Sequence, residues 1–406
     1  MQESALSGLT VVELSEQVSG PYCARMLGAL GAEVIKVEKA PSGDRARNMG
    51  PFISDEPDPE MSALFLYLNT NKKSVTLDWE TSVGRDILER ILMQADVLVE
   101  NFPPGYMDSH GLSFESLQKI NPRLIIVSMS DFGSSGPYRE WTATPQVNLA
   151  LGGYMYLSGE ESREPLSMPG HQADYLAGLH AYLGCLMALW YRDDSGLGQR
   201  VEVATMESLA ALSQFTTVMH TYNDTIRRRH GNRWESASSY GSYPNTVLPC
   251  KDGHVSFTVS TEKQWELLCV MIGRPDLLDD PRMLTFQNSR SHADEIDEIL
   301  LDWLKDKTKQ EVFQTASGLW SVPVAPVSQL SEVVDDPQYR SRELCIELDH
   351  PSAGLLTYPT VPFKMSGSPP SFKRAPLLGE HNHEVYCSIL GYTDSELASF
   401  SEMGVV

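Results

Sequence analysis

The sequence predicts an α/β fold with a large Rossmann-like domain, built on a mostly parallel sheet, and a smaller α+β domain. Short β-rich runs alternate with helical periodicity in the first half of the chain, which is the pattern of strands and helices wound around one sheet. Leu124–Val127 is a continuous apolar run, as expected for a strand buried on both faces. With 406 residues, 41% of them hydrophobic, the chain is long enough for two domains.

Two βαβ units follow one another in the N-terminal half. Thr10–Leu14 and Glu33–Val37 are predicted strands on either side of a helix that begins near Ser19 and stops at a glycine. The same order recurs in a strand at Ser74–Leu77, a helix over about Val83–Met93 and a strand at Val97–Val99. Neither GxGxxG nor GxxxxGKS/T occurs, so the predicted sheet carries no dinucleotide fingerprint and no nucleoside-triphosphatase loop.

The middle of the chain begins with a long apolar helix, predicted over about Leu176–Arg192 from apolar residues at helical spacing. A strand at Val201–Val203 and a helix over Glu207–His220 follow. Arg227–Pro249 is basic at first and then rich in Ser, Tyr and Asn, without periodicity, which predicts a linker or crossing loop.

The smaller domain is predicted from a hairpin and two helices. Cys250–Val259 has the pattern of a hairpin arm with Asp252–Gly253 as its turn. Helices are expected over about Glu262–Ile272 and His292–Asp306, and from about Pro326 the chain becomes proline-rich and returns to short strands. The predicted division is residues 1–225 for the large domain, 226–325 for the small domain and 326–406 for a return to the large domain.

Composition excludes several classes of protein. A net charge of −22 argues against binding to nucleic acid or to an anionic membrane surface, because both attract basic patches. The six cysteines are dispersed and form no CxxC pair, so we expect no metal site. Neither a secretory signal pattern nor an apolar run of membrane-spanning length is seen, which predicts a cytoplasmic protein.

Asp174 is the strongest candidate for a catalytic residue. It stands at the predicted start of the long apolar helix, in N-cap position, with Gly178 in the first turn. A short carboxylate there can cap backbone N–H groups, and it can also act as a covalent nucleophile toward an activated acyl group. The position of Asp174 in the sequence, taken alone, favours the role of helix cap over that of nucleophile.

Five segments in order change that balance: residues 6–47, 69–78, 95–112, 121–133 and 374–381, the last reading RAPLLGEH. Together they make the chain resemble the class III CoA-transferases, the family of formyl-CoA transferase and carnitine CoA-transferase. The resemblance extends from Leu6 to about Val406. It implies an enzyme that moves CoA from an acyl-CoA donor to a free carboxylic acid, with Asp174 carrying the acyl group and then CoA. It also implies an interlocked homodimer and no tightly bound cofactor.

The resemblance assigns CoA and the reacting thioester to the loop Gln17, Val18 and Ser19, which follows the first predicted strand. Family members often have Gln where this chain has Val18, and Gln17 stands one place earlier, so the resemblance does not by itself give Gln17 the family's role in gating the intermediate. Backbone N–H groups at the start of the Asp174 helix and in the Gly152–Gly153 turn are predicted to stabilise the oxyanion.

A cationic cluster follows the second strand. Lys39, Arg45 and Arg47 stand out against the negative net charge, and we predict that they clamp the phosphates of CoA. Lys39 matches an arginine of the family, and a lysine there loses the bidentate fork. The remaining predicted contacts to CoA are Lys72, Leu77, Asn101 and Phe102.

Two departures from the family pattern concern charged residues. Ser109 stands where the family often has an arginine, and Arg139 is a candidate to replace that cation. Between Trp141 and Gly153 many members carry an acidic residue, and this chain has Pro145 instead. The pocket for the acceptor acid is therefore predicted to differ from that of the relatives.

Three other functions compete with CoA transfer as interpretations of the sequence. An α-methylacyl-CoA racemase needs a second base, and Thr144 stands where its histidine would be; His171 is a weaker candidate for that role. A non-catalytic acyl-CoA binder would use Asp174 only as a helix cap. A serine hydrolase is excluded because the sequence has no G-x-S-x-G elbow.

Overall fold

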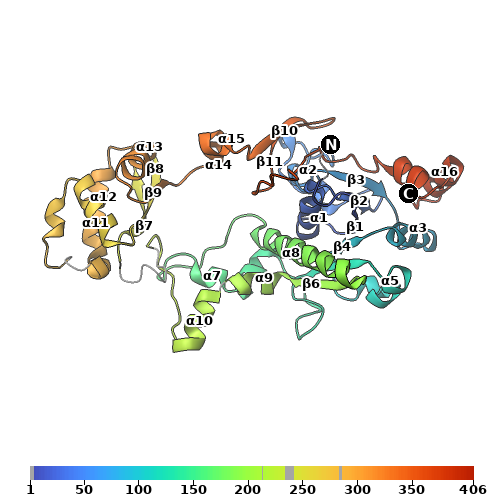
Figure 1. Cartoon of the computed structure of the whole chain (residues 1–406), viewed down its shortest axis with the longest axis horizontal. Helices are drawn as coiled ribbons and strands as arrows, with labels where there is room; N and C mark the ends of the chain where they lie inside the picture. The colour runs from blue at the N-terminus through green and yellow to red at the C-terminus, as the bar shows by residue number, and fades with distance from the viewer. Residues whose placement is uncertain (1–3, 213, 234–241, 283–285) are drawn as a thin grey trace. The chain divides into compact units, whose positions relative to one another are not determined.

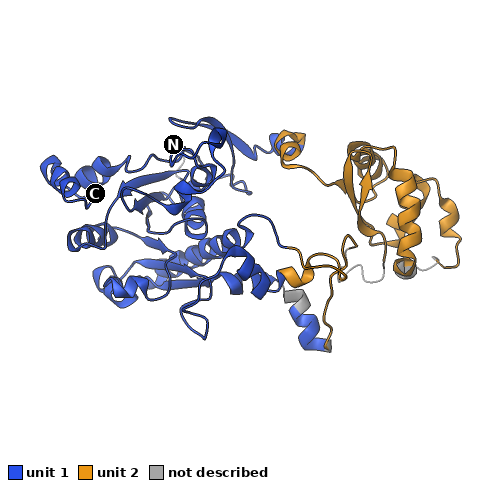
Figure 2. Cartoon of the chain, turned by 180° about the vertical axis from the view of Figure 1, so that it is seen from behind, with its two compact units in different colours: residues 1–154, 167–222, 338–406 blue, residues 155–166, 223–337 orange. Residues whose placement is uncertain are grey.

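The computed structural model describes residues 4–212, 214–233, 242–282 and 286–406, and it divides into two compact units. Unit 1 contains residues 1–154, 167–222 and 338–406, and unit 2 contains residues 155–166 and 223–337 (Figure 2). The predicted boundaries differ from this division at three places. Residues 155–166 and 223–225 belong to unit 2 rather than to the large domain, and unit 2 continues to residue 337, past the predicted end at 325. Among the described residues, no helix is both long and apolar enough to cross a membrane.

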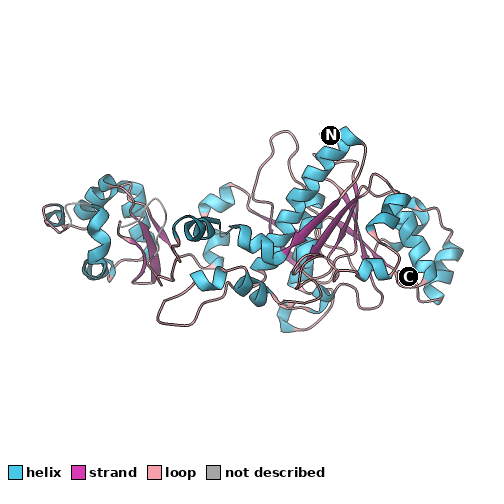
Figure 3. Ribbon diagram, turned by 90° about the horizontal axis from the view of Figure 1, so that it is seen from below, coloured by secondary structure: helices cyan, strands magenta, loops and turns pink. Residues whose placement is uncertain are grey.

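Unit 1 is built on a six-stranded sheet in which every neighbouring pair of strands is parallel (Figures 1 and 3). The strand order is β3-β2-β1-β4-β5-β6, the order of a Rossmann-like sheet, so the predicted fold class is confirmed. The strands are β1 Thr10–Glu13, β2 Glu33–Glu38, β3 Lys72–Thr76, β4 Val97–Glu100, β5 Ile125–Ser130 and β6 Arg200–Ala204.

The two faces of the sheet are covered by different helices, because alternate residues of each strand point to opposite sides. Val11, Val97 and Val127 pack against α1 (Ser19–Ala29) and α8 (Gln172–Ser195). Val12, Leu98 and Ile126 point to the other face. That face is covered by α3 Ser82–Met93, α5 Phe114–Ile120 and η7 Glu384–Ile389, with α16 Asp394–Glu402 at its margin.

Unit 2 has its own core and its own sheet. β7 (Asn245–Cys250), β8 (Gly253–Thr258) and β9 (Val324–Pro326) form an antiparallel sheet that packs with α11 (Glu262–Met271) and α12 (Ala293–Leu304). A further antiparallel pair in unit 1 joins β10 Cys345–His350 to β11 Gly354–Pro359.

Shorter elements complete the chain. They are η1 Arg45–Asn48, η2 Ile53–Asp55, α2 Ala63–Leu68, α4 Tyr106–Ser109, α6 Pro145–Leu151, α7 Tyr154–Leu157, α9 Thr205–Leu212, α10 Gln214–Asn223, η4 Pro275–Leu278, η5 Phe286–His292, α13 Lys309–Phe313, η6 Gln314–Leu319, α14 Leu330–Asp335 and α15 Pro337–Ser341.

The predicted helix Glu207–His220 corresponds to α9 and α10, with residue 213 outside the described residues. Two other sequence predictions are wrong in detail. Gly253 already pairs with Cys250, so the hairpin turn lies one residue earlier than predicted. Most of the predicted linker 227–249 lies outside the described residues or in loops, but its end forms β7 because it pairs with β8.

Close packing of α8 on α1 depends on Gly178. A Cβ there would lie 2.4 Å from the carbonyl oxygen of Ser19, a backbone atom that cannot turn away. We expect Gly178→Ala to cost about 1–3 kcal/mol of unfolding free energy through overpacking. The gain in helix propensity, about 1 kcal/mol, offsets only part of this.

Chemical denaturation of Gly178→Ala measures this loss directly. The matched control is Gly318→Ala in η6, where a Cβ would meet no atom within 4 Å. Equal midpoints for both variants would show that the α1–α8 contact tolerates a methyl group.

Candidate active site

A cavity of about 410 Å³ lies at the carboxyl ends of the parallel strands of unit 1. The loops after β1 and β4 both contribute to it, and these neighbouring strands mark the point where the strand order reverses. Open α/β sheets bind ligands at this switch point, because the two loops leave it in opposite directions. The cavity is lined by Gln17, Val18, Ser19, Arg45, Met49, Asn101, Phe102, Pro103, Pro104, Met129, Ser130, Asp131, Phe132, Arg139, Trp141, Thr142, Ala143, Pro145, His171, Asp174 and Thr205.

Asp174 lies in this cavity with 23% of its side chain exposed. It is not the N-cap: α8 begins at Gln172, its N-cap is His171, and Asp174 is the third helical residue. The prediction placed the helix start too late because the first turn is polar and carries no apolar periodicity. Asp174 still points to the cavity from the helix N-terminus, where the peptide dipoles favour a negative charge.

His171 contacts Asp174 directly. Its Nδ1 lies 3.3 Å from Asp174 Oδ2. Burial raises the pKa of Asp174 above its ordinary value, the bond and charge of His171 lower it, and the charge of Asp131 raises it further. The net direction is upward, so a larger share of Asp174 is protonated at a given pH than for a carboxyl group in water.

The loop after β1 is held by Asn101, which follows β4. Asn101 accepts a hydrogen bond from the Glu16 N–H at 2.9 Å and donates to the Glu16 carbonyl at 2.8 Å. It also donates to Ser19 Oγ at 3.3 Å. Asn101 therefore holds the loop in place through its hydrogen bonds. It also lines the cavity to which the resemblance assigns CoA.

Gln17 adopts a left-handed backbone conformation, with φ of 64°. Such a conformation is unfavourable for a residue with a side chain and persists only when the surroundings enforce it. Here the Gln17 N–H donates to Asp44 Oδ1 at 2.9 Å. The strain lies in the loop that lines the cavity, which is where functional sites commonly store it.

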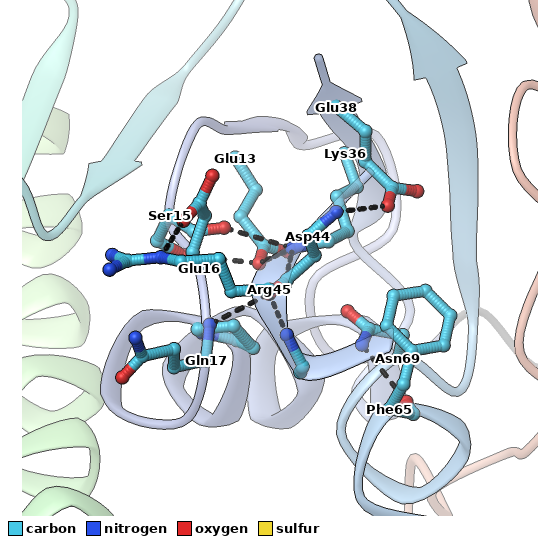
Figure 4. A network of polar contacts seen from close by, with 12 residues as sticks. Glu13, Ser15, Glu16, Gln17, Lys36, Glu38, Asp44, Arg45, Phe65 and Asn69 are labelled. Atoms are coloured by element: carbon cyan, nitrogen blue, oxygen red, sulfur yellow. Dashed lines mark hydrogen bonds and ion pairs between the residues drawn. The ribbon is translucent and has the colours of Figure 1, made fainter. Parts of the chain in front are cut away.

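Asp44 is held in turn by a buried group of charges (Figure 4). Lys36 Nζ lies 2.7 Å from Asp44 Oδ2, 2.9 Å from Glu13 Oε1 and 2.9 Å from the Ser15 carbonyl oxygen. None of the Lys36, Glu13 or Asp44 side chains is exposed to more than a trace of solvent. Burial by itself raises the pKa of Glu13, but Lys36 and Lys72 outweigh it, and the pKa falls below its usual range.

Arg47 and Lys72 do not reach the cavity, which corrects their prediction as contacts to CoA. Arg47 is fully buried, with Glu38 and Glu60 as its ion-pair partners, and Lys72 is paired with Glu13 at 2.7 Å. Arg47 neutralises Glu38 and Glu60, and Lys72 shares the buried Glu13 with Lys36, so both cations are occupied by carboxylates. The sequence could not show this, because the partners come from neighbouring strands and loops.

Lys39 and Leu77 also lie outside the cavity. Lys39 is about half exposed and pairs with Glu80 at 2.7 Å, so it remains accessible to an anionic ligand. Leu77 is buried in the core of the sheet, and only its neighbour Asp78 reaches the surface. Arg139 lines the cavity and pairs with Glu140 at 2.7 Å.

Phe102 links the cavity to an aromatic group outside it. Its ring centroid lies 4.7 Å from that of Tyr106 and 5.6 Å from that of Trp79. His110 completes the group, 5.4 Å from Trp79. Lys39 and Tyr106 both bind Glu80, so a cation stands beside these rings.

The Gly152–Gly153 turn does not supply oxyanion donors. The Gly152 N–H bonds the Asn148 carbonyl at 2.8 Å and the Gly153 N–H bonds the Ala150 carbonyl at 3.3 Å. Neither glycine lines the cavity. The N–H groups of the first turn of α8 are the better candidates, because the first N–H groups of a helix have no partner within it.

Sequence reasoning missed Asp131 and Thr205. Both follow strands at the same edge of the sheet as the loop after β1, Asp131 after β5 and Thr205 after β6. The signal was present for Asp131: a polar residue directly after a buried strand belongs to the ligand-binding edge.

Comparisons with known proteins bear on this site. A family model described as CoA-transferase family III matches residues 6–382. A protein named formyl-CoA:oxalate CoA-transferase from Streptomyces avermitilis is 33% identical, over 99% of this chain and 99% of its own. One of the same name from Streptomyces coelicolor is 32% identical over 100% of both chains.

Two solved structures are similar to this one. A CAIB/BAIF family protein from Brucella suis has 29% identity and a TM-score of 0.85, covering 95% of this chain and 100% of that one. An aspartate-to-alanine mutant of Rv3272 from Mycobacterium tuberculosis has 27% identity and a TM-score of 0.80, covering 95% of this chain and 99% of that one. With the Rossmann-like sheet and the cavity at its switch point, these matches confirm the predicted resemblance: the chain belongs to CoA-transferase family III, whose members are acyl-CoA:carboxylate CoA-transferases.

Proposed function

We propose that this enzyme transfers CoA through covalent intermediates on Asp174. The observation that carries the proposal is a half-buried carboxylate at the N-terminus of α8, inside a cavity at the switch point of the sheet. Burial strips water from the carboxylate and His171 orients it, which suits a nucleophile aimed at a bound thioester.

The proposed sequence has three balanced exchanges. An oxygen of ionised Asp174 attacks the donor thioester carbonyl, the C–S bond breaks, and an acyl-aspartyl anhydride and CoA thiolate are formed. The thiolate attacks the aspartyl carbonyl, releases the donor acid as a carboxylate, and leaves an aspartyl-CoA thioester. The acceptor carboxylate then repeats these steps in reverse, so that Asp174 is regenerated as the new acyl-CoA departs.

Each tetrahedral intermediate places a negative charge on one oxygen. We propose that N–H groups of the first turn of α8 stabilise it, because they point out of the helix end beside Asp174. This assignment replaces the Gly152–Gly153 turn.

We propose that CoA lies across Phe102, from the cavity to the aromatic group. The pantetheine would pass Phe102, and the adenosine end would reach Trp79, Tyr106 and Lys39. The substrates are then an acyl-CoA and a free carboxylic acid. The relatives named above act, by their names, on formyl-CoA and oxalate.

Trapping the intermediate tests the mechanism and separates it from simple acyl-CoA binding. The enzyme is incubated with acetyl-CoA or succinyl-CoA, treated with hydroxylamine, digested and analysed by mass spectrometry. We expect a hydroxamate on the peptide that carries Asp174. An enzyme that exchanges CoA among acids without ever modifying this peptide would contradict the proposal.

We also propose that the chain forms the interlocked homodimer implied by the family. Leu183, Met187 and Trp190 recur at helical spacing along α8, with 43%, 70% and 77% exposure, opposite the face that packs on the sheet. A continuous apolar stripe of this size is unfavourable in water and typical of an interface.

Charging this stripe should separate the subunits. We expect Met187→Glu with Trp190→Glu to shift the protein from dimer to monomer in sedimentation velocity, because burying a carboxylate in an apolar interface is strongly unfavourable. The control is Met403→Glu on the C-terminal segment, which is also exposed. A doubly charged variant that stays dimeric would place the interface elsewhere.

A further inference from the structure

Asp131 presents a second carboxylate to the cavity that contains Asp174. It follows β5 directly. Its Oδ2 accepts a hydrogen bond from the Ala143 N–H at 2.7 Å, and its Oδ1 accepts one from Asn148 Nδ2 at 2.9 Å. These bonds fix the carboxylate against the segment 143–148, of which Ala143 and Pro145 also line the cavity.

Asp131 has no cation of its own. Within the part of the chain that the structure describes, it forms no ion pair. The arginines of the cavity, Arg45 and Arg139, are paired with Glu16 and Glu140. His171 is directed at Asp174. The negative charge of Asp131 therefore acts on whatever occupies the cavity.

The position of Asp131 connects to the sequence departure at Pro145. The resemblance leads to an expected acidic residue in the segment 141–153, and this chain has none at Pro145. Instead Asp131 reaches the same segment from the end of β5 and binds Ala143 and Asn148 on either side of that position. The cavity wall therefore does contain a carboxylate. It comes from the end of β5 and not from the segment 141–153, so it faces the ligand from a different position.

We propose that Asp131 determines the class of acceptor acid: it disfavours acids that bring a second carboxylate into the cavity and favours monocarboxylic acids with a neutral or cationic tail. This inference rests on the proposed function, since it concerns the acid that takes CoA from Asp174. The reason is Coulombic. Two negative charges about 5 Å apart repel appreciably in a partly buried site, and partial exposure reduces the effect.

A matched set of acceptors tests the proposal. Butyrate, succinate and γ-aminobutyrate have the same chain length and differ in the charge at the far end. With one acyl-CoA donor, we expect kcat/KM for the unaltered enzyme to be lowest for succinate. Asp131→Asn should raise the succinate-to-butyrate ratio about tenfold or more, and it should lower the ratio of γ-aminobutyrate to butyrate.

Asp131→Asn removes the charge with little change in shape. The new amide can still accept the Ala143 N–H, and it can donate to Asn148 Oδ1, which is buried without a partner among the described residues, once the Asn148 amide turns over. Asp131→Ser is a second variant. We expect it to raise the succinate-to-butyrate ratio and to lower the γ-aminobutyrate-to-butyrate ratio, as Asp131→Asn does. Glu115→Gln, an exposed carboxylate on α5, is the control for net charge alone.

The outcomes separate the two proposals. Ratios that are unchanged in both Asp131 variants, while the Asp174 peptide is still acylated, would overturn the role of Asp131 and leave the mechanism standing. An unaltered enzyme that prefers succinate would do the same. Failure to acylate Asp174 in the unaltered enzyme would overturn the mechanism and, with it, this inference.

Discussion

Asp174→Ala is expected to lower the rate of CoA exchange by roughly a thousandfold or more, the scale on which loss of a covalent nucleophile is measured. The carboxylate is half-buried in the cavity and is the group on which both proposed intermediates form. Asp131, the other carboxylate among the described residues that line the cavity, does not replace it, because both of its oxygens are already bound by Ala143 and Asn148. The measurement is kcat/KM for a donor and acceptor pair that the unaltered enzyme uses.

Two controls distinguish chemistry from folding. Asp174→Asn keeps the size of the side chain and should be as inactive as the alanine variant, with an unchanged denaturation midpoint. His171→Ala should retain more activity, because His171 contacts Asp174 without taking part in the covalent steps. It should also move the acidic limb of the pH profile upward, since His171 lowers the pKa of Asp174 and its removal leaves the raising effect of burial unopposed. Full activity in Asp174→Asn would refute covalent catalysis at this residue.

Lys36→Met is expected to cost about 3–5 kcal/mol of unfolding free energy, the loss typical when one partner of a buried ion pair is removed. Lys36 is the cation shared by Glu13 and Asp44, at 2.9 and 2.7 Å, and all three side chains are buried. Without it, Asp44 keeps no cation at this distance among the described residues. Chemical denaturation gives the loss, and Lys39→Met is the control, since Lys39 is about half exposed.

The same variant should also reduce activity beyond its effect on stability. Asp44 Oδ1 holds the strained Gln17 N–H, so a displaced Asp44 releases the loop that lines the cavity. Combining Lys36→Met with Asp44→Asn should recover part of the stability, because one buried charge is removed, without recovering kcat/KM. If Lys36→Met were as stable as Lys39→Met and as active as the unaltered enzyme, the buried charges would have no role in supporting the loop.

Much of the fold follows from local pattern. The β-rich runs that form β1, β2, β4 and β5 are short, apolar and bounded by turns. Their secondary structure therefore depends on few contacts with distant residues. The start of α8 was misplaced because its first turn is polar, and Asp174 moved from the cap into the helix as a result. The segment 155–166 was assigned to the wrong unit, since its place is set by contacts with residues far along the chain.

By itself, the sequence determined the alternation of strands and helices, the family, and the residues that meet at the switch point, including Gln17, Asn101 and Asp174. Those features are written in neighbouring residues or in the order of segments. Only the tertiary structure decided which charges face the ligand. Arg47 and Lys72 turn inward to buried carboxylates, and Asp131 turns toward the cavity. The direction of a charged side chain depends on partners brought close by the parallel sheet, and the distance between two charges in space is not encoded in their separation along the chain.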